Sequence, residues 1–266
     1  MFQGFSYTQI YNTIEKVEAY WKTFKPTNST SINLNKWEDQ DNFFRQLSFH
    51  HCVAIMVWDA VTNRFLYVAD ESGVFGHDIS LFTKENGVDF SLGNFHPDCL
   101  NGYLILQKCG IEYCMDHPKY AGKIILSCDG VYKRNNGSYF KLMQQAVIVE
   151  ANSEGQPLVF LSYIHDISHL KKGFASNLII KTPCEVEIWN YDFERKTLGK
   201  PYVFTSHENK ILSLLRDGKQ TKQIAEMLCS SPHTVDTHRR NLLKKTNCVD
   251  TTALVTYARM TGLIHH

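Results

Sequence analysis

Polar and basic side chains gather on one side of a helix that the sequence predicts from Pro232 to Thr246. Ser231 followed by Pro232 is a typical helix start, and Val235 and Leu242 mark the buried side. At about 100° per residue, the opposite side carries hydrogen-bonding and cationic groups. These are His233, Thr237, Arg240 and Lys244, flanked by Asp236 and Asn241. Such groups contact base edges and neutralise phosphates, which is the chemistry of nucleic-acid recognition.

A helix face that is merely exposed to solvent is also polar, and most runs of charged residues are explained in this way. The distribution of charge favours DNA binding instead. Residues 204–266 contain nine Lys or Arg and five Asp or Glu, a net charge of +4, whereas the preceding residues carry a net charge of −3. The basic pairs Arg239-Arg240 and Lys244-Lys245 fall on one helix, and an α-helix fits the major groove of duplex DNA.

Two shorter helices are predicted before this one. Thr205 and Glu208 have the spacing of a capping box, which opens a helix that stops at Gly218. A second helix begins at Thr221, and Cys229-Ser230-Ser231 forms the turn that follows it. A helix, a tight turn and a second helix constitute a helix-turn-helix.

Residues 204–264 resemble the LuxR-type DNA-binding domain. The landmarks that carry the resemblance are Glu208, Gly218, Ile224-Ala225, Ser231-Pro232-His233-Thr234-Val235, His238 and Gly262-Leu263-Ile264. Two positions depart from the family, Thr246 where leucine is usual and Asn247 where glycine is common. The resemblance implies a fourth helix, Thr251 to Thr261, which commonly dimerises, so that paired domains would read an inverted repeat.

The resemblance also implies roles for individual side chains. The predicted DNA-binding residues are His233, Thr234, Asp236, Thr237, Arg239, Arg240, Lys244 and Lys245. Asp236, Thr237 and Arg240 would face base edges, while the other three cations and the backbone amide at Thr234 would contact phosphates. Arg240 suits a guanine edge, and Asp236 accepts only from a cytosine or adenine amino group.

The chain of 266 residues is long enough for two domains, and its first part has a different pattern. Two apolar strands are predicted over 52–58 and 65–69, followed by short helices and a long helix that begins at Pro97. Three further strands are predicted over 123–134, 139–151 and 158–167, joined by Asn- and Gly-containing turns.

This order of elements resembles the PAS sensor domain over residues 40–170. The resemblance rests on Val53 to Asp78, on Phe95-His96-Pro97-Asp98, and on Arg134 to Tyr139 leading to His165-Asp166-Ile167-Ser168. It implies a five-stranded antiparallel sheet around a pocket that holds a cofactor, a small metabolite or nothing. We therefore predict an α+β fold with a helical extension (1–37), a PAS-like domain (38–170), a connector (171–203) and a helix-turn-helix domain (204–266). The connector fits either a strand pair or one helical face.

No cofactor or metal is predicted. The asparagine-cysteine-arginine motif of flavin-adduct PAS domains is absent, which makes Cys99 and Cys109 poor photochemical candidates. His96 and His117 are the candidate haem ligands, but a lone loop histidine is more often a turn or surface residue. The eight cysteines contain no C-x-x-C and are interpreted as reduced structural thiols, and the strand aromatics as core.

Catalysis is not expected, because Cys114-Met115-Asp116-His117 and His165-Asp166 lack a nucleophile elbow, phosphate loop or metal spacing. The sequence has no apolar run of membrane-spanning length and no export signal. The prediction is a cytoplasmic bacterial transcription regulator that binds double-stranded DNA as a homodimer, with RNA polymerase as a further partner. An apolar stripe from Ile10 to Phe24 is expected to support the dimer. In the alternative, the PAS-like half is an interaction or dimerisation module with no small-molecule ligand.

Overall fold

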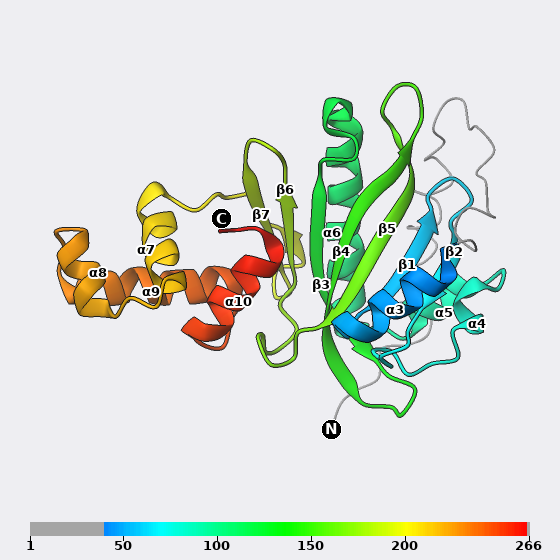
Figure 1. Ribbon diagram of the computed structural model, residues 1–266, viewed down its shortest axis with the longest axis horizontal. Coiled ribbons are helices and arrows are strands. Elements are labelled where there is room, and N and C mark those ends of the chain that lie inside the picture. Colours follow the sequence, from blue (N-terminus) through cyan, green and yellow to red (C-terminus); the bar gives the residue numbers. More distant parts are fainter. Residues whose placement is uncertain (1–39, 265–266) are drawn as a thin grey trace.

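The computed structural model describes residues 40–264, so the predicted stripe from Ile10 to Phe24 lies outside the described residues. One antiparallel sheet with the strand order β2-β1-β5-β4-β3-β6-β7-β8 organises this part of the chain (Figure 1). The strands are β1 (Ala54–Asp59), β2 (Arg64–Ala69), β3 (Ile125–Lys133), β4 (Tyr139–Ala151), β5 (Pro157–Asp166), β6 (Asn177–Lys181), β7 (Val186–Asp192) and β8 (Thr197–Leu198).

The fold class is α+β as predicted, but the prediction of five strands is wrong. The sheet has eight strands, because residues 177–198 of the connector add β6, β7 and β8 beside β3. Four residues of β6 are buried, and β6 pairs with β3 from Ile125 to Cys128. Without β6, the backbone N–H and C=O groups of β3 would form an open edge, so the connector completes the sheet.

The helices lie in sequence before β3 and after β8. Those before β3 are α3 (Asp41–His51), α4 (Ser80–Thr83), α5 (Gly87–Gly93) and α6 (Pro97–Asp116), with a 3-10 turn at Pro118–Tyr120. Those after β8 are α7 (Ser206–Arg216), α8 (Thr221–Met227), α9 (Pro232–Thr246) and α10 (Thr251–Thr261). Helix α6 begins at Pro97 as predicted, and the ring of His96 caps it by accepting the Asp98 amide at 3.2 Å.

Strand register assigns each residue of the sheet to one of two faces. Ile164, Gln144, Cys128 and Leu178 are aligned across β5, β4, β3 and β6 and face helices α4 to α6. The row next to it, with Tyr163, Gln145, Ser127 and Ile179, belongs to the opposite face. We call these the inner and the outer face.

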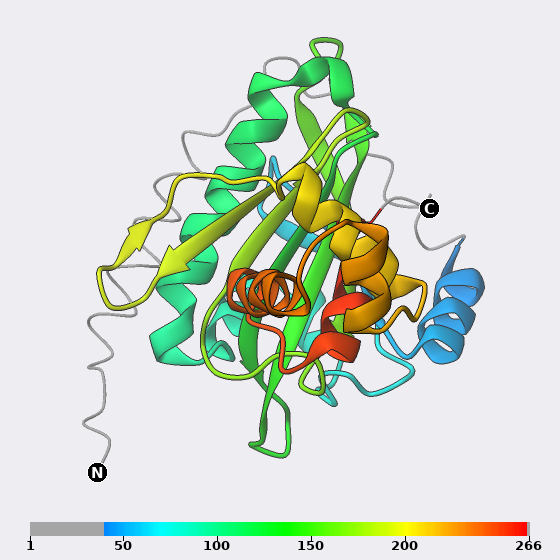
Figure 2. The ribbon, with the colours of Figure 1, turned by 90° about the vertical axis from the view of Figure 1, so that its left-hand side faces the viewer.

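The outer face is covered at two places. Helix α3 packs through Phe44 against β1 and β2. The C-terminal helices α7 to α10 pack against the other end, around Met143, Ile179 and Ile188 (Figures 1 and 2). The residues 40–203 are called the N-terminal domain below, and residues 204–264 the C-terminal domain. Between residues 40 and 264, no helix has both the length and the apolar character required to cross a membrane.

Candidate nucleic-acid interface

The helices of the C-terminal domain begin and end at local signals in the sequence. In the predicted capping box, the Thr205 hydroxyl accepts from the Glu208 amide at 3.2 Å and a Glu208 oxygen accepts from the Thr205 amide at 2.9 Å. Helix α9 is capped by Ser231, whose hydroxyl accepts from the Thr234 amide at 3.1 Å. Asn247 follows α9 with a φ of 58°, a left-handed conformation that asparagine tolerates better than most residues.

The buried side of α9 agrees with the sequence pattern. Val235, Leu242 and Thr246 are fully buried in the core shared with α7, α8 and α10. The Thr246 hydroxyl donates to the Leu242 carbonyl at 2.9 Å, so a polar group is satisfied where the LuxR-type pattern has leucine. His238 and Arg239, which lie between Val235 and Leu242 in the helix, are half-buried.

The opposite side of α9 faces solvent. The exposed members of the predicted DNA-binding set are His233, Thr234, Asp236, Arg240 and Lys244, and Thr237 is half-buried among them. The Arg240 guanidinium donates to the Thr237 hydroxyl at 3.3 Å, which places two of the three side chains predicted to face base edges together. A hollow beside them is lined by His233, Asp236, Arg239, Arg240, Leu243 and Thr251.

Arg239 holds three helices together. Its guanidinium donates to Thr221 on α8 at 2.7 Å and to Thr251 on α10 at 2.8 Å. It also pairs with Asp236 one turn earlier on α9 at 3.3 Å. This pair partly neutralises a carboxylate on a surface that would otherwise repel phosphates. Thr221 and Thr251 are not among the site residues predicted from the sequence, because nothing local marks a hydroxyl as the partner of a distant arginine.

Lys245 lies apart from the exposed set. Its ammonium is 2.7 and 2.9 Å from the two carboxylate oxygens of Glu208, whose side chain is 5% exposed. Burial opposes ionisation of Glu208, but the Lys245 ammonium and the Thr205 amide outweigh it and keep the pKa of this carboxyl below its usual value. The backbone carbonyl of Lys245 accepts from Tyr202 at 2.7 Å and from Asn177 at 3.2 Å.

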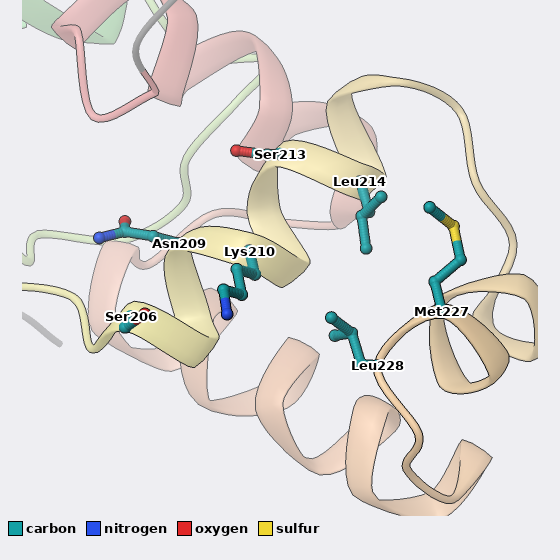
Figure 3. A pocket seen from close by; sticks show the side chains of 7 residues that line it. All are labelled: Ser206, Asn209, Lys210, Ser213, Leu214, Met227 and Leu228. Atoms are coloured by element: carbon teal, nitrogen blue, oxygen red, sulfur yellow. The ribbon is translucent and has the colours of Figure 1, made fainter.

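A second hollow lies on the side of the C-terminal domain formed by α7 and α8 (Figure 3). Leu214, Met227 and Leu228 point toward one another there, with Asn209 and Lys210 along the rim. Met227 is 58% exposed. No residue of α9 lines this hollow, so we assign it no part in reading DNA.

The inner face of the N-terminal domain contains a partly buried polar cluster between α6 and the sheet. A Gln144 oxygen accepts from the Tyr103 hydroxyl and from Gln107 at 3.0 Å, and the Gln144 amide donates to Ser162 at 2.9 Å. Burial raises the pKa of Tyr103 well above its usual value, so its hydroxyl stays protonated as a donor. The side chains satisfy one another within the aromatic core.

The two candidate haem ligands have other contacts. His96 caps α6, and its ring packs edge-on against Tyr139 and at a tilt against Phe174, with ring centroids 4.8 and 4.4 Å away. His117 stacks on Tyr113 at 4.1 Å. Among residues 40–264, no group of three or more His, Cys, Asp or Glu side chains has the arrangement of a metal site.

Helices α8 and α9, joined by a short turn and supported by α7 and α10, define the C-terminal domain as a helix-turn-helix domain. Residues 202–258 match the family of bacterial regulatory proteins of the LuxR type. The chain therefore carries a LuxR-type helix-turn-helix domain at its C-terminus.

Relatives that the chain resembles in sequence are regulatory proteins. It is 21% identical over 234 residues to the HTH-type quorum-sensing regulator RhlR of Pseudomonas aeruginosa, a match that covers 79% of this chain and 97% of RhlR. It is 39% identical over 61 residues to the regulatory protein SdiA of Escherichia coli, covering 23% of this chain and 25% of SdiA. Among solved structures, the VqmA–ligand–DNA complex of Vibrio cholerae has a TM-score of 0.33 at 15% identity, covering 90% of this chain and 92% of VqmA. A structural similarity at that level carries no conclusion about this chain.

Proposed function

We propose that this protein is a transcription regulator that reads duplex DNA through the exposed face of α9. The observation that carries the proposal is the grouping of Arg240, Lys244, Thr237 and His233 on the solvent side of the helix whose other side is buried. The N-terminal end of α9 adds amide groups that favour an anion, such as a phosphate. Asp236, Thr237 and Arg240 would face base edges, as the LuxR-type resemblance implies.

Lys244, Arg239 and Lys245, the three cations predicted to contact phosphates, differ in their surroundings within the C-terminal domain. Lys244 is exposed and forms the simplest phosphate contact. Arg239 is 31% exposed and is held by two threonines, so it would meet the backbone as a pre-positioned group. Lys245 is paired with Glu208, and we assign it to the stability of the domain.

The N-terminal domain would sense a signal or set the geometry of a dimer. The polar cluster around Gln144 supports the first role, because ligand sites combine an apolar lining with a few fixed polar groups. The alternative is an interaction module with no small-molecule ligand. Native mass spectrometry separates the two, since a bound metabolite adds its mass to that of the protein. We further propose a cytoplasmic homodimer that acts on RNA polymerase.

The full-length protein is expected to enrich specific genomic fragments, and its affinity for them should fall steeply with salt. Two phosphate contacts per C-terminal domain predict a loss of about tenfold between roughly 50 and 200 mM salt, and about a hundredfold for a dimer. Pull-down of genomic fragments followed by sequencing tests the first expectation, and fluorescence anisotropy tests the second. Affinity that is insensitive to salt, or no enrichment of any fragment, would contradict the proposal.

Alanine substitutions of Arg240 and Lys244 should affect DNA binding in different ways. Arg240→Ala is expected to relax the preference at one base position by about 1–3 kcal/mol, because a bidentate contact to one base is lost. Lys244→Ala, the matched control one turn later, should weaken binding to all sequences about equally. Selection of binding sites from a random library measures both. An unchanged motif for Arg240→Ala would show that Arg240 does not read a base.

A further inference from the structure

A buried ionic group lies where the C-terminal domain meets the sheet. Asp129 on the outer face of β3 pairs with the Lys171 ammonium, and both side chains are 0% exposed. The Tyr257 hydroxyl on α10 donates to the other Asp129 oxygen at 2.9 Å. The Lys171 ammonium also lies 4.3 Å from the centre of the Tyr257 ring. Asp129 therefore has partners from the connector and from the C-terminal domain at once.

The segment that carries Lys171 is held on both sides. Lys171 forms an isolated antiparallel bridge with Cys248, and the Val249 amide donates to the Leu170 carbonyl at 3.0 Å. The buried Lys141 ammonium donates to the carbonyls of Gly173 and Ala175. The ion pair thus sits on a fixed backbone between the two domains.

If any one partner is removed while the others stay buried, a charge or an acceptor is left unpaired. The free-energy cost of that unpaired group exceeds the cost of exposing all three side chains to water. A partly opened contact, in which Tyr257 has left Asp129 before water reaches it, is therefore unfavourable. The carboxylate would be satisfied either with α10 docked, by Lys171 and Tyr257, or with α10 withdrawn, by water.

On the inner side of β3, the neighbours of Asp129 belong to the core of the N-terminal domain. Cys128 is buried in that core, and Gly130 packs against two aromatic rings. A Cβ atom on Gly130 would lie 2.8 Å from the Phe95 ring and 3.1 Å from the Tyr103 ring. Displacement of these rings therefore pushes on β3 at the residue next to Asp129, because packed cores transmit strain.

On the other side of the buried ionic group, α10 connects to the exposed face of α9. Thr251, the first residue of α10, accepts from Arg239 at 2.8 Å, and Arg239 pairs with Asp236. Tyr257 lies in the middle of the same helix. Contacts are thus continuous from the rings around Gly130, through Asp129 and Tyr257, to a residue of the proposed DNA-reading face.

We propose that Asp129, Lys171 and Tyr257 form a latch through which the packing of the N-terminal core controls whether α10 stays on the sheet. Tyr257 releases Asp129 when β3 shifts, and α10 then leaves the sheet, which also breaks the 2.8 Å hydrogen bond from the Gln145 amide to the Met260 carbonyl. Residues 248–249 stay bonded to residues 170–171. The consequence for DNA rests on the proposed function, but the latch itself does not.

The test is amide hydrogen exchange of the full-length protein without DNA. Tyr257→Phe removes one hydroxyl and keeps the ring. Exchange in residues 251–264 is expected to become about tenfold to a hundredfold faster, which is the factor that one hydrogen bond to a charged group is worth. Tyr139→Phe is the matched control, since the Tyr139 side chain is exposed on β4 away from the latch. Exchange in 251–264 that is unchanged in Tyr257→Phe would overturn the proposal.

Coupling to the core is tested with Gly130→Ala, whose Cβ presses on Phe95 and Tyr103. This variant should also accelerate exchange in residues 251–264. In the double variant with Tyr257→Phe, the acceleration should be smaller than the product of the accelerations in the two single variants. Phe160→Leu, which loosens the same core on β5, should leave 251–264 unchanged. If Gly130→Ala does not fold, Cys128→Ala perturbs the same side of β3. Multiplicative effects, or equal acceleration by Phe160→Leu, would overturn the coupling. Because no DNA is present, these results are independent of whether the chain binds DNA.

Discussion

Lys245→Ala is expected to destabilise the C-terminal domain by about 3 kcal/mol and to weaken binding to every DNA sequence. The reason is the nearly buried Glu208, which would lose the partner that lies 2.7 Å away. A third of the Lys245 side chain remains exposed, so water reaches part of the pair and the cost lies at the low end for a buried ion pair. The capping box would weaken too, because Glu208 also accepts from Thr205.

Urea unfolding followed by circular dichroism measures this loss of stability. Lys244→Ala is the matched control, because the exposed Lys244 should lose DNA affinity without losing stability. The Lys245→Ala variant could instead keep wild-type stability and lose DNA affinity as Lys244→Ala does. That result would show that Lys245 contacts phosphate, as predicted from the sequence.

Acid is expected to destabilise the N-terminal domain through His165. Burial and the charge of His51 lower the pKa of His165 from 6.5 to about 4 in the folded protein. The unfolded chain therefore binds a proton between about pH 6.5 and 4 that the folded protein does not. The stabilisation is complete above pH 6.5 and is lost as the pH falls, by at most about 3 kcal/mol at pH 4.

Urea unfolding at pH 7, 5.5 and 4.5 checks this window. His165→Gln should flatten the dependence on pH across it, because glutamine does not titrate. His169→Gln is the matched control, since His169 is exposed four residues away. An equally steep loss of stability in His165→Gln would assign the acid sensitivity to other groups.

The parts that the sequence predicts well depend on neighbours in the chain. The caps at Thr205 and Ser231 and the start of α6 at Pro97 are local signals, and the structure places all three as expected. The buried side of α9 follows from the 3.6-residue period. The predicted number of strands was too low, because a short apolar run such as 178–180 fits either a strand or a helix until its partner strand is known.

The roles of single charged residues were harder to predict. Lys244 and Lys245 are adjacent and chemically identical, yet one is exposed and the other is paired with Glu208, 37 residues earlier. Arg239 finds its partners on two other helices. The docking of α10 on β3 joins Tyr257 to Asp129, 128 residues apart, with no pattern that links them. Tertiary contacts of this kind leave no periodic signal.

The apolar core that the two domains share limits how the C-terminal domain can be exchanged in a chimera. The LuxR-type match ends at residue 258, but Leu263 and Ile264 are buried beyond it in the cluster that contains Met143 and Ile179. A chimera that exchanges only residues 202–258 would leave the apolar residues on the outer face of β4, β6 and β7 against a surface that was not selected to fit them. Exchange of this domain would therefore require residues 263–264 and the outer face of the sheet to change with it, so the structural unit is larger than the matched residues.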